Sequence, residues 1–359
     1  MNGRRDERLN RLLVVKLADI GDVLTATPAL RALRETYPNA RVDLLTTPAA
    51  AGVTPRSLVH QVLTAPRTLV ASPADLPGFA RLLSTLRRGR YDAVVFLHHL
   101  TLASGVLKYR LLAAATGAPM VVGLDNGNGA WLTHPVPDEG FGAVHEVDYA
   151  LRTVAALGAT TSDLSLAAQC DDMDRQYAAR LLESLPLGHR VAIHPGSGGY
   201  SMARRWEPAK WAAVADSLME RYGAQVILIG TPVDGADSVQ SAMRGQATNL
   251  SGQTSLPQLT ALLGQCDLVL GADSGVMHLA AATGVPVVAL FGPSNHLAWG
   301  PWTPAGRSSV VRLGIRCSPC SYVGHSVGQR DGCWHRSCMA DLEPAQVLAA
   351  VEAMDVLVD

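Results

Sequence analysis

The sequence predicts an α/β protein built from two consecutive parallel-sheet units. Short runs rich in β-branched residues alternate with amphipathic helical stretches along most of the chain, which is typical of repeated β-α-β units. A polar connection near residues 165–190 interrupts this alternation, which starts again at Arg190. The 359 residues accommodate two domains at roughly 150 residues each. We therefore predict two open α/β domains, at residues 1–170 and 171–343.

The alternation predicts particular strands and helices in each unit. In the first unit we expect strands at Leu12–Lys16, Val42–Leu45, Ala93–Leu97 and Met120–Val122, and helices at Pro28–Tyr37, Gly78–Arg88 and Leu102–Thr116. In the second unit we expect strands at Val191–His194, Gln225–Ile229, Asp267–Leu270 and Val287–Leu290, and helices at Pro208–Tyr222, Ala236–Arg244, Leu256–Leu263 and Gly275–Thr283. A last helix, Pro344–Leu357, is long enough to cross back, so we expect residues 344–359 to pack on the N-terminal domain. Ligands of open parallel sheets bind beyond the carboxyl ends of the strands, and two such ends can face each other across a cleft.

Composition excludes several classes of function. A net charge of -1 with 17% charged residues gives no electrostatic basis for binding nucleic acid. Residues 1–11 are polar and the apolar run after them stops at Lys16, so no secretory signal is visible. No apolar segment approaches the ~20 residues of a transmembrane helix. We expect a soluble, cytoplasmic protein.

The stretch "RLLVVKLADIGDVLTATPAL" places two charged residues at the end of the first strand. Lys16 closes the strand, where it serves either as an ion-pair partner or as a phosphate ligand, and Asp22 begins the following helix. A carboxylate at a helix start can simply cap the helix and complement its dipole, or it can perform chemistry. His98 and His99 follow the strand that ends "VVFLHH", so they also project from a carboxyl end, with a role that the sequence leaves open.

The stretch "GADSGVMHLAAATGVPVVALFGPS" reads as a strand, a capped helix and another strand. Ser274 or Asp273 is the expected N-cap, and the helix begins near Gly275. Free amides at a helix start form an anion site suited to a phosphate. His278 lies one turn further along the same helix. The alternative interpretation is a capped core helix with a buried histidine.

The stretch "VAIHPGSGGYSMARRWEPAKW" joins a strand to a helix through a loop rich in glycine. Gly196, Ser197 and the two glycines after them let a backbone approach a ligand closely, and Arg204 and Arg205 could neutralise a diphosphate. The glycines do not open directly into a helix, which argues against a dinucleotide fingerprint. The alternative is a surface loop with solvated arginines.

Together, "VVKLADIGDVLTATPALRAL", "HPGSGG…RRW" and "DSGVMHLAAATGVPVVALFGP" resemble the ADP-heptose-dependent heptosyltransferases, glycosyltransferase family 9. The three motifs occur in the right order over most of the chain. The resemblance implies the GT-B fold, in which two Rossmann-like parallel-sheet domains face a central cleft. It also implies an inverting, metal-independent transfer of a heptose from ADP-heptose to an acceptor hydroxyl on lipopolysaccharide core, a protein or a small molecule.

The resemblance implies roles for individual residues. Asp22 matches the general base that deprotonates the acceptor hydroxyl, and Arg204 matches the basic residue that stabilises the departing ADP. Asp234 matches the acidic residue at the ribose, and Gly252–Ser255, which includes Thr254, matches the wall of the adenine pocket. The remaining donor-side residues are Lys16, Gly196, Ser197, Arg205, Asp273, Ser274, Gly275 and His278, and we place His98 and His99 on the acceptor side.

The acceptor stays open at this level. Enzymes of the inner lipopolysaccharide core resemble one another in carrying basic clusters in the first domain. The corresponding region here, "VTPRSLVHQVLTAPRTLVASPADLPGF", holds only Arg56 and Arg67. A strongly anionic lipid acceptor is therefore less firmly indicated than the donor.

Four of the six cysteines form the pattern C-x2-C-x12-C-x4-C: Cys317, Cys320, Cys333 and Cys338. Four thiols at this spacing can close a tetrahedral zinc or iron site, and His325 or His335 could replace one of them. The segment resembles the cysteine finger of the autotransporter heptosyltransferases, which bind iron there. The alternative is a loop of reduced, unligated thiols. We expect no cofactor in catalysis and a structural iron or zinc at this segment.

Two other functions compete with glycosyl transfer. A nucleotide-sugar epimerase could use the same scaffold, but it needs no acceptor groove and leaves Asp22 without a task. A donor-binding module without catalysis would not need Asp22, Arg204 and His278 together. Heptosyl transfer therefore accounts for more of the chain's residues than either alternative.

Overall fold

The computed structural model describes residues 9–183, 185–199, 201–304 and 306–357, and these residues form two compact units. The first unit contains the described residues up to Ala167 together with Gly324–Ser326, and the second contains the rest. The predicted boundary after residue 170 falls three residues beyond the observed one. Residues 358–359 of the predicted C-terminal helix lie outside the described residues. No helix within the described ranges is long and apolar enough to cross a membrane.

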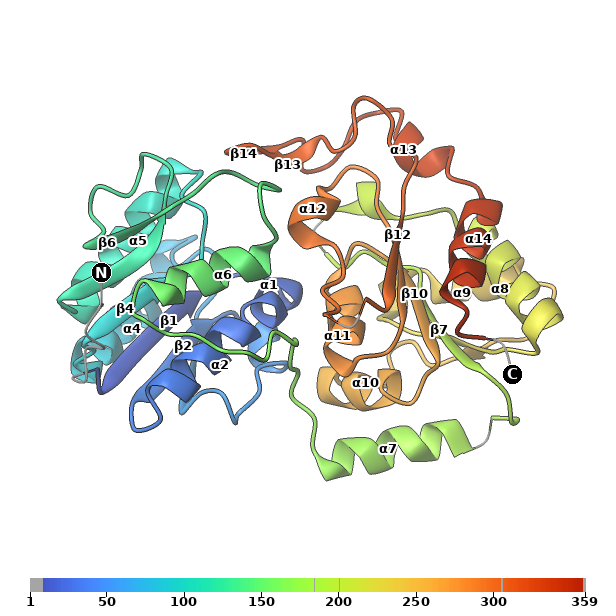
Figure 1. Ribbon diagram of the computed structural model, residues 1–359, viewed down its shortest axis with the longest axis horizontal. Helices are drawn as coiled ribbons and strands as arrows, with labels where there is room; N and C mark the ends of the chain where they lie inside the picture. Colours follow the sequence, from blue (N-terminus) through green and yellow to red (C-terminus); the bar gives the residue numbers. More distant parts are fainter. Residues whose placement is uncertain (1–8, 184, 200, 305, 358–359) are drawn as a thin grey trace. The chain divides into compact units, whose positions relative to one another are not determined.

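The first unit is built on a six-stranded parallel sheet (Figure 1). Its strands lie in the order β3-β2-β1-β4-β5-β6. This order places the first strand beside the fourth, at the point where the direction of sheet growth reverses. In such sheets, ligands bind outside the carboxyl ends of the strands at that switch point. The strands are β1 (Arg11–Lys16), β2 (Arg41–Thr46), β3 (Gln61–Thr64), β4 (Ala93–Phe96), β5 (Met120–Asp125) and β6 (His134–Pro137).

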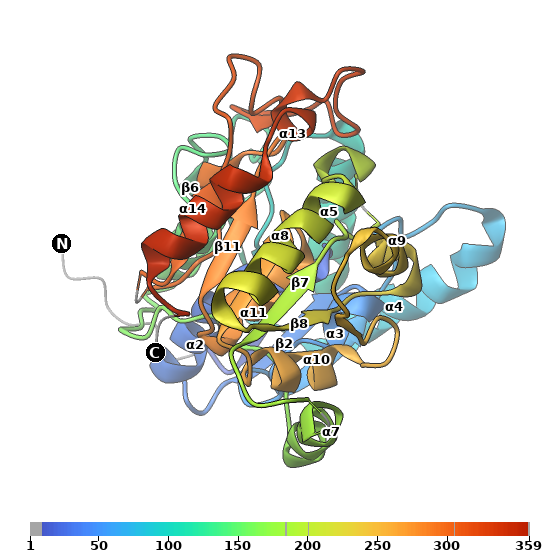
Figure 2. The ribbon, with the colours of Figure 1, turned by 90° about the vertical axis from the view of Figure 1, so that its right-hand side faces the viewer.

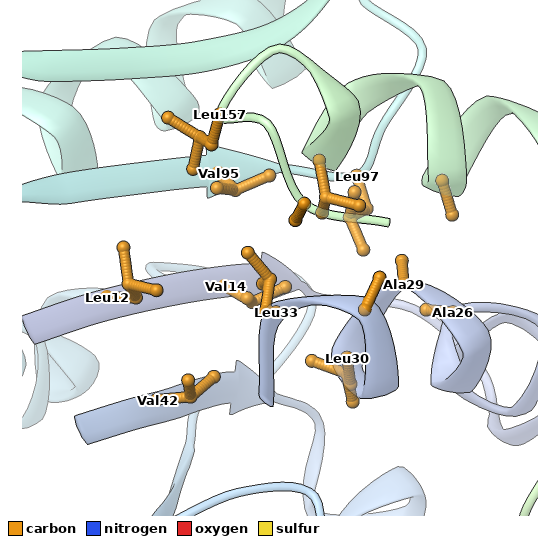
Figure 3. Packing of buried hydrophobic residues seen from close by; sticks show 14 of the residues in the cluster. Leu12, Val14, Ala26, Ala29, Leu30, Leu33, Val42, Val95, Leu97 and Leu157 are labelled. Carbon is orange, nitrogen blue, oxygen red and sulfur yellow. The ribbon is translucent and has the colours of Figure 1, made fainter. Parts of the chain in front are cut away.

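Helices cover both faces of this sheet, because successive side chains of each strand point to opposite faces. Leu12 and Val14 belong to the core beneath α2 and α6 (Figure 3). Leu13 and Val15 belong to the opposite core, which also contains residues of α4 and α5. Burial on both faces explains why β1 is a continuous apolar run rather than an alternating one. The helices of this unit are α1 (Ile20–Thr25), α2 (Thr27–Thr36), α3 (Pro48–Ala51), α4 (Leu76–Gly89), α5 (Ala103–Thr116) and α6 (Glu146–Ala155).

The second unit repeats this topology. Its parallel strands lie in the order β12-β11-β10-β7-β8-β9, so β7 and β10 flank the switch point. They are β7 (Arg190–His194), β8 (Gln225–Leu228), β9 (Thr248–Asn249), β10 (Leu268–Ala272), β11 (Val287–Leu290) and β12 (Ser308–Val311), and a small ribbon is formed by β13 (Ser321–Val323) and β14 (Ser326–Gly328). The helices are α7 (Asp172–Glu183), α8 (Pro208–Tyr222), α9 (Ala236–Ala242), α10 (Leu256–Leu263), α11 (Gly275–Thr283), α12 (His296–Trp299), α13 (Ser337–Ala340) and α14 (Pro344–Met354). The predicted fold class of two parallel α/β units is confirmed.

The position predicted for the C-terminal helix is wrong. Helix α14 packs against α8, β11 and β12 of the second unit, and α14 lies beside α8 in Figure 2. The preceding segment is fixed there, because Trp206 Nε1 and Lys210 Nζ donate to the carbonyl oxygen of Leu342 at 3.0 and 2.9 Å. An apolar helix face in a sequence indicates burial, but it does not indicate which core receives it.

Some local predictions also differ from the structure. Helix α1 begins at Ile20, two residues before the predicted start, with Asp19 at the N-cap position. The four short strands at the sheet edges, β3, β6, β9 and β12, were not predicted, and neither was α6. The edge strands have two to four residues each, too few for a clear hydrophobic period.

Candidate active site

The switch point of the first sheet brings together the charged residues predicted near the start of the chain. Lys16 is the last residue of β1, and its Nζ lies 3.7 Å from Oδ1 of Asp22 and 4.0 Å from Oε2 of Glu146. The Lys16 side chain is buried, with 7% exposed, whereas that of Asp22 is 25% exposed. Lys16 is therefore an ion-pair partner inside the unit, and Asp22 presents the more accessible carboxylate.

Asp22 does not cap the helix, so the capping alternative given for it is wrong. It is the third residue of α1, within the first turn, while Asp19 holds the N-cap position. A carboxylate in the first turn still lies at the positive end of the helix dipole. Asp22 therefore has the Lys16 ammonium beside it and lies at the positive end of α1.

His98 lies against the end of β1 as a neutral ring. Its Nε2 accepts a hydrogen bond of 2.9 Å from the amide of Leu17, so that nitrogen carries no proton. The ring stacks on Tyr109 at 4.6 Å between centroids. Burial, together with the nearby charges of Lys16 and Lys108, holds the pKa of His98 well below its usual value. His98 thus supports the backbone at Leu17, where β1 leads toward α1.

His99 lies between two carboxylates that the sequence did not single out. Its Nδ1 is 2.9 Å from Oδ2 of Asp138, and its Nε2 is 2.9 Å from Oε1 of Glu146. Burial opposes protonation of the ring, but the two carboxylates outweigh it and raise the pKa of His99 to about 9. Glu146 is the first residue of α6. The sequence could have indicated Glu146 only through a predicted helix start at this position.

The switch point of the second sheet gathers the motif residues at the ends of β7 and β10. Ser274 is the N-cap of α11, where its Oγ accepts from the amide of Met277 at 3.4 Å, and this expected cap is confirmed. The same Oγ lies 3.2 Å from Nδ1 of His194, the last residue of β7. His278 is buried on α11, with 3% exposed. The arrangement presents the first amides of α11 at the carboxyl edge of the sheet, which suits an anion.

Arg204 and Arg205 bind two different carboxylates. Arg204 Nη1 lies 3.0 Å from Oδ2 of Asp273, directly before the α11 cap. Arg205 Nη2 lies 3.3 Å from Oδ1 of Asp234, and its Nη1 donates to the carbonyl oxygen of Val233 at 2.8 Å. Of the two arginines, Arg204 is therefore the one that pairs with the residue next to the N-cap of α11.

Asp234 is held by several donors of its own unit. Its Oδ2 accepts from the amide and hydroxyl of Thr231 at 2.8 and 2.7 Å and lies 3.5 Å from Nε2 of His194. Burial alone would raise the pKa of Asp234, but the hydrogen bonds from His194 and Thr231 outweigh it and hold the pKa well below its usual value. The carboxylate therefore organises the loop after β8.

The glycine-rich loop fits closely around the Asp234 carboxylate. A Cβ on Gly196 would lie 2.1 Å from Oδ1 of Asp234, so a protein carboxylate occupies the close approach that we predicted for a ligand. Ser197 is buried, and its Oγ donates to the carbonyl oxygen of Ser201 at 2.8 Å. Thr254 lies half-buried in the loop before α10.

The four cysteines of the C-terminal segment line one pocket of about 270 Å³, together with His335. Cys338 is buried on α13, and burial with the neighbouring thiols raises its pKa to about 11. Within the described residues, no three or more His, Cys, Asp or Glu side chains meet closely enough to hold a metal ion. The segment thus brings four thiols to one pocket, but the described side chains do not lie close enough together to form a metal site.

Comparison with known proteins identifies relatives that cover most of the chain. Residues 79–329 match the family model "Glycosyltransferase family 9 (heptosyltransferase)". Lipopolysaccharide heptosyltransferase 3 of Escherichia coli K12 is 31% identical over 296 residues, covering 79% of this chain and 83% of that protein.

Two solved structures share the fold. E. coli ADP-heptose lipopolysaccharide heptosyltransferase II aligns with a TM-score of 0.71 at 22% identity, over 96% of this chain and 98% of that one. The iron-containing dodecameric glycosyltransferase TibC of enterotoxigenic E. coli aligns with a TM-score of 0.57 at 15% identity, over 96% of this chain and 78% of that one.

Proposed function

The chain belongs to glycosyltransferase family 9, the heptosyltransferases, and we propose that it transfers a heptose from ADP-heptose to a hydroxyl of a lipopolysaccharide core acceptor. The observation that carries this proposal is the Lys16–Asp22 pair at the switch point of the first sheet. A carboxylate that is partly exposed, lies beside an ammonium and is placed where ligands of such sheets bind is suited to act as a general base.

In the proposed reaction, Asp22 takes the proton from the acceptor hydroxyl. The acceptor oxygen then attacks the anomeric carbon of the heptose, and the bond from that carbon to the diphosphate oxygen breaks with inversion. ADP leaves with the electron pair, and the proton stays on Asp22 until solvent removes it. A positioned base of this kind contributes a factor of about 10²–10⁴ to the rate.

The second unit is proposed to hold the donor. The first amides of α11 and the Arg204 guanidinium would stabilise negative charge on the diphosphate as it departs. Gly275 and His278 belong to the same helix, and Asp273 orients Arg204 through their 3.0 Å pair. Arg205 and Asp234 form an ion pair, which favours a role for both residues in shaping the loop beside the nucleotide. A direct contact between Asp234 and the ribose is then the less favoured of its two proposed roles. Thr254 remains the proposed adenine-side residue.

The four-cysteine segment is proposed to bind one structural metal, iron or zinc. Support comes from the donor set, since four thiols line one pocket, and from the fold relative TibC, an iron-containing glycosyltransferase. Four protein ligands would leave no open position for a reactant, so the metal would order the segment and take no part in transfer. Closing the ligand shell would require the thiols to draw together.

A nucleotide-sugar epimerase is the second candidate, and the family match disfavours it.

We place the protein in the cytoplasm, where nucleotide sugars are available.

The test is a donor screen followed by turnover. We expect ADP-heptose to raise the melting temperature more than ADP-glucose, UDP-sugars or GDP-sugars, because a ligand that binds only the folded state stabilises it. With heptose-deficient lipopolysaccharide as acceptor, ADP release and a mass increase of one heptose should follow. Stabilisation by a UDP-sugar alone, with no transfer from ADP-heptose, would contradict the proposal.

A further inference from the structure

A row of alternating charges runs through the first unit and ends at Asp22. The order is Asp138, His99, Glu146, Lys16 and Asp22, with successive separations of 2.9, 2.9, 4.0 and 3.7 Å. The members come from the segments after β6 and β4, the start of α6, the end of β1 and the first turn of α1. Only the last member has a place in the proposed chemistry as the base.

The interior members of the row are buried. The side chains of Asp138, Glu146 and His99 are 0%, 5% and 6% exposed. Both ring nitrogens of His99 face carboxylate oxygens, so both donate only when the ring is an imidazolium. The contacts that raise the pKa of His99 outweigh burial and lower the pKa of Glu146. The ring is also fixed sideways, by Phe141 at 4.2 Å and Tyr149 at 4.9 Å between centroids.

Lys16 is the member of the row that can form an ion pair with either of two carboxylates. It lies between the buried carboxylate of Glu146 and the more exposed carboxylate of Asp22. A buried carboxylate without a counter-charge is costly, so it competes for any cation within reach. The His99 imidazolium satisfies Glu146 from the other side, which leaves Lys16 for Asp22.

We infer that His99 is a positioning residue for the transfer reaction: by neutralising Glu146, it keeps the Lys16 ammonium beside Asp22 and holds that carboxylate in place. This inference rests on the proposed function, in which Asp22 is the base. Among the described residues, the charged and titratable groups that face the row include His98 and His145, which are adjacent in sequence to His99 and Glu146. Tyr109 of α5 acts on Asp22, Tyr149 of α6 packs on His99, and His325 places its Nδ1 3.8 Å from Oδ1 of Asp138.

The test is a double-mutant cycle between His99 and Glu146. His99→Gln removes the cation and leaves Glu146 to draw Lys16 away, so we expect kcat to fall at least about tenfold while the KM for the donor changes less than about twofold. Glu146→Gln in the same chain removes the competing carboxylate. The double variant should therefore recover kcat to within about threefold of the wild type, a coupling that a loss of packing alone would not produce.

The matched control is His134→Gln, a half-buried histidine on β6 of the same unit that lies outside the row. His99→Gln with the activity of this control would overturn the inference. A loss in His99→Gln that Glu146→Gln does not restore would overturn it as well, because His99 would then act through something other than Glu146 and Lys16.

A second readout is independent of turnover. The chain has only three lysines, Lys16, Lys108 and Lys210, so the side-chain nitrogen signal of Lys16 can be assigned in ¹⁵N-lysine-labelled protein. We expect this signal to move in His99→Gln and to return in the double variant. If Asp22→Asn proves active, the proposed base is wrong, and the Lys16 signal still decides the inference: an unchanged signal in His99→Gln overturns it.

Discussion

The Nζ of Lys16 lies 3.7 Å from Oδ1 of Asp22, across the turn between the first strand and the first helix. A buried ammonium at the end of a parallel strand is unusual, because charged side chains are seldom buried unless paired. Here it supports a carboxylate that stays partly exposed at the switch point of the sheet. The pair therefore joins the fold of the first unit to the proposed proton transfer.

His99 makes stability depend on pH. The unfolded pKa of histidine is ~6.5, and the folded value is raised to about 9, so the stabilising contribution is complete below ~6.5 and is lost as the pH rises through about 9. We expect the difference in unfolding free energy between the wild type and His99→Gln, of order 1–3 kcal/mol near neutral pH, to shrink as the pH rises to 10. Urea unfolding at pH 7, 8.5 and 10 measures it. A constant difference across this range would show that the ring is not protonated in the folded protein.

Arg204 and Arg205 should differ in kind. Arg204→Ala removes charge beside the α11 cap, so we expect ADP affinity to fall about tenfold or more and transfer to slow with it. Arg205→Ala should mainly lower the melting temperature, because it leaves the buried Asp234 with one partner fewer. Calorimetric titration with ADP and thermal unfolding of both variants separate the two. Normal ADP binding in Arg204→Ala with severe loss in Arg205→Ala would reverse the assignment.

Gly196 tests the packing of the loop against Asp234. A Cβ there would lie 2.1 Å from the Asp234 carboxylate, whereas a Cβ on Gly199 meets nothing within 4 Å. We expect Gly196→Ala to destabilise the protein by about 1–3 kcal/mol through overpacking, with Gly199→Ala close to the wild type. Chemical denaturation of the two variants gives the comparison. Equal stabilities would mean that the loop does not hold Asp234 as described.

The cysteine segment should carry metal. Protein purified without chelator should contain close to one equivalent of iron or zinc by elemental analysis, and Cys333→Ser should lose it. Cys266→Ser, a buried cysteine outside the segment, is the control and should keep the metal. Metal-free protein with full activity and an unchanged melting temperature would remove the proposal.

The sequence predicted the carboxyl ends of the central strands well, and for a physical reason. A strand buried on both faces is a continuous apolar run, so the residue that ends the run, such as Lys16 or the pair His98 and His99, marks the edge of the sheet. What each side chain meets there could not be predicted. Glu146 lies 47 residues from His99 in the chain, and their contact depends on how α6 packs on the sheet.

The misplaced elements have similar causes. Two aspartates lie near the start of α1, Asp19 before it and Asp22 within its first turn, and the sequence alone does not show which of them marks the helix start. We predicted that Gly196 lets a ligand approach the backbone, because a glycine in a loop indicates a close approach. The sequence does not show that the group approaching it is the Asp234 carboxylate. The sequence of α14 shows an apolar face, but only the three-dimensional structure shows which core that face packs into.

The central claim is that Asp22 is the base of a heptosyl transfer from ADP-heptose. Its most direct test is the initial rate of ADP release with ADP-heptose and a lipopolysaccharide acceptor, for the wild type and Asp22→Asn, with ADP affinity measured on both. The amide keeps the size of the side chain but cannot take the proton. We expect the rate to fall by about 10²–10⁴ while ADP affinity stays within a few-fold. Turnover by Asp22→Asn close to that of the wild type would contradict the claim.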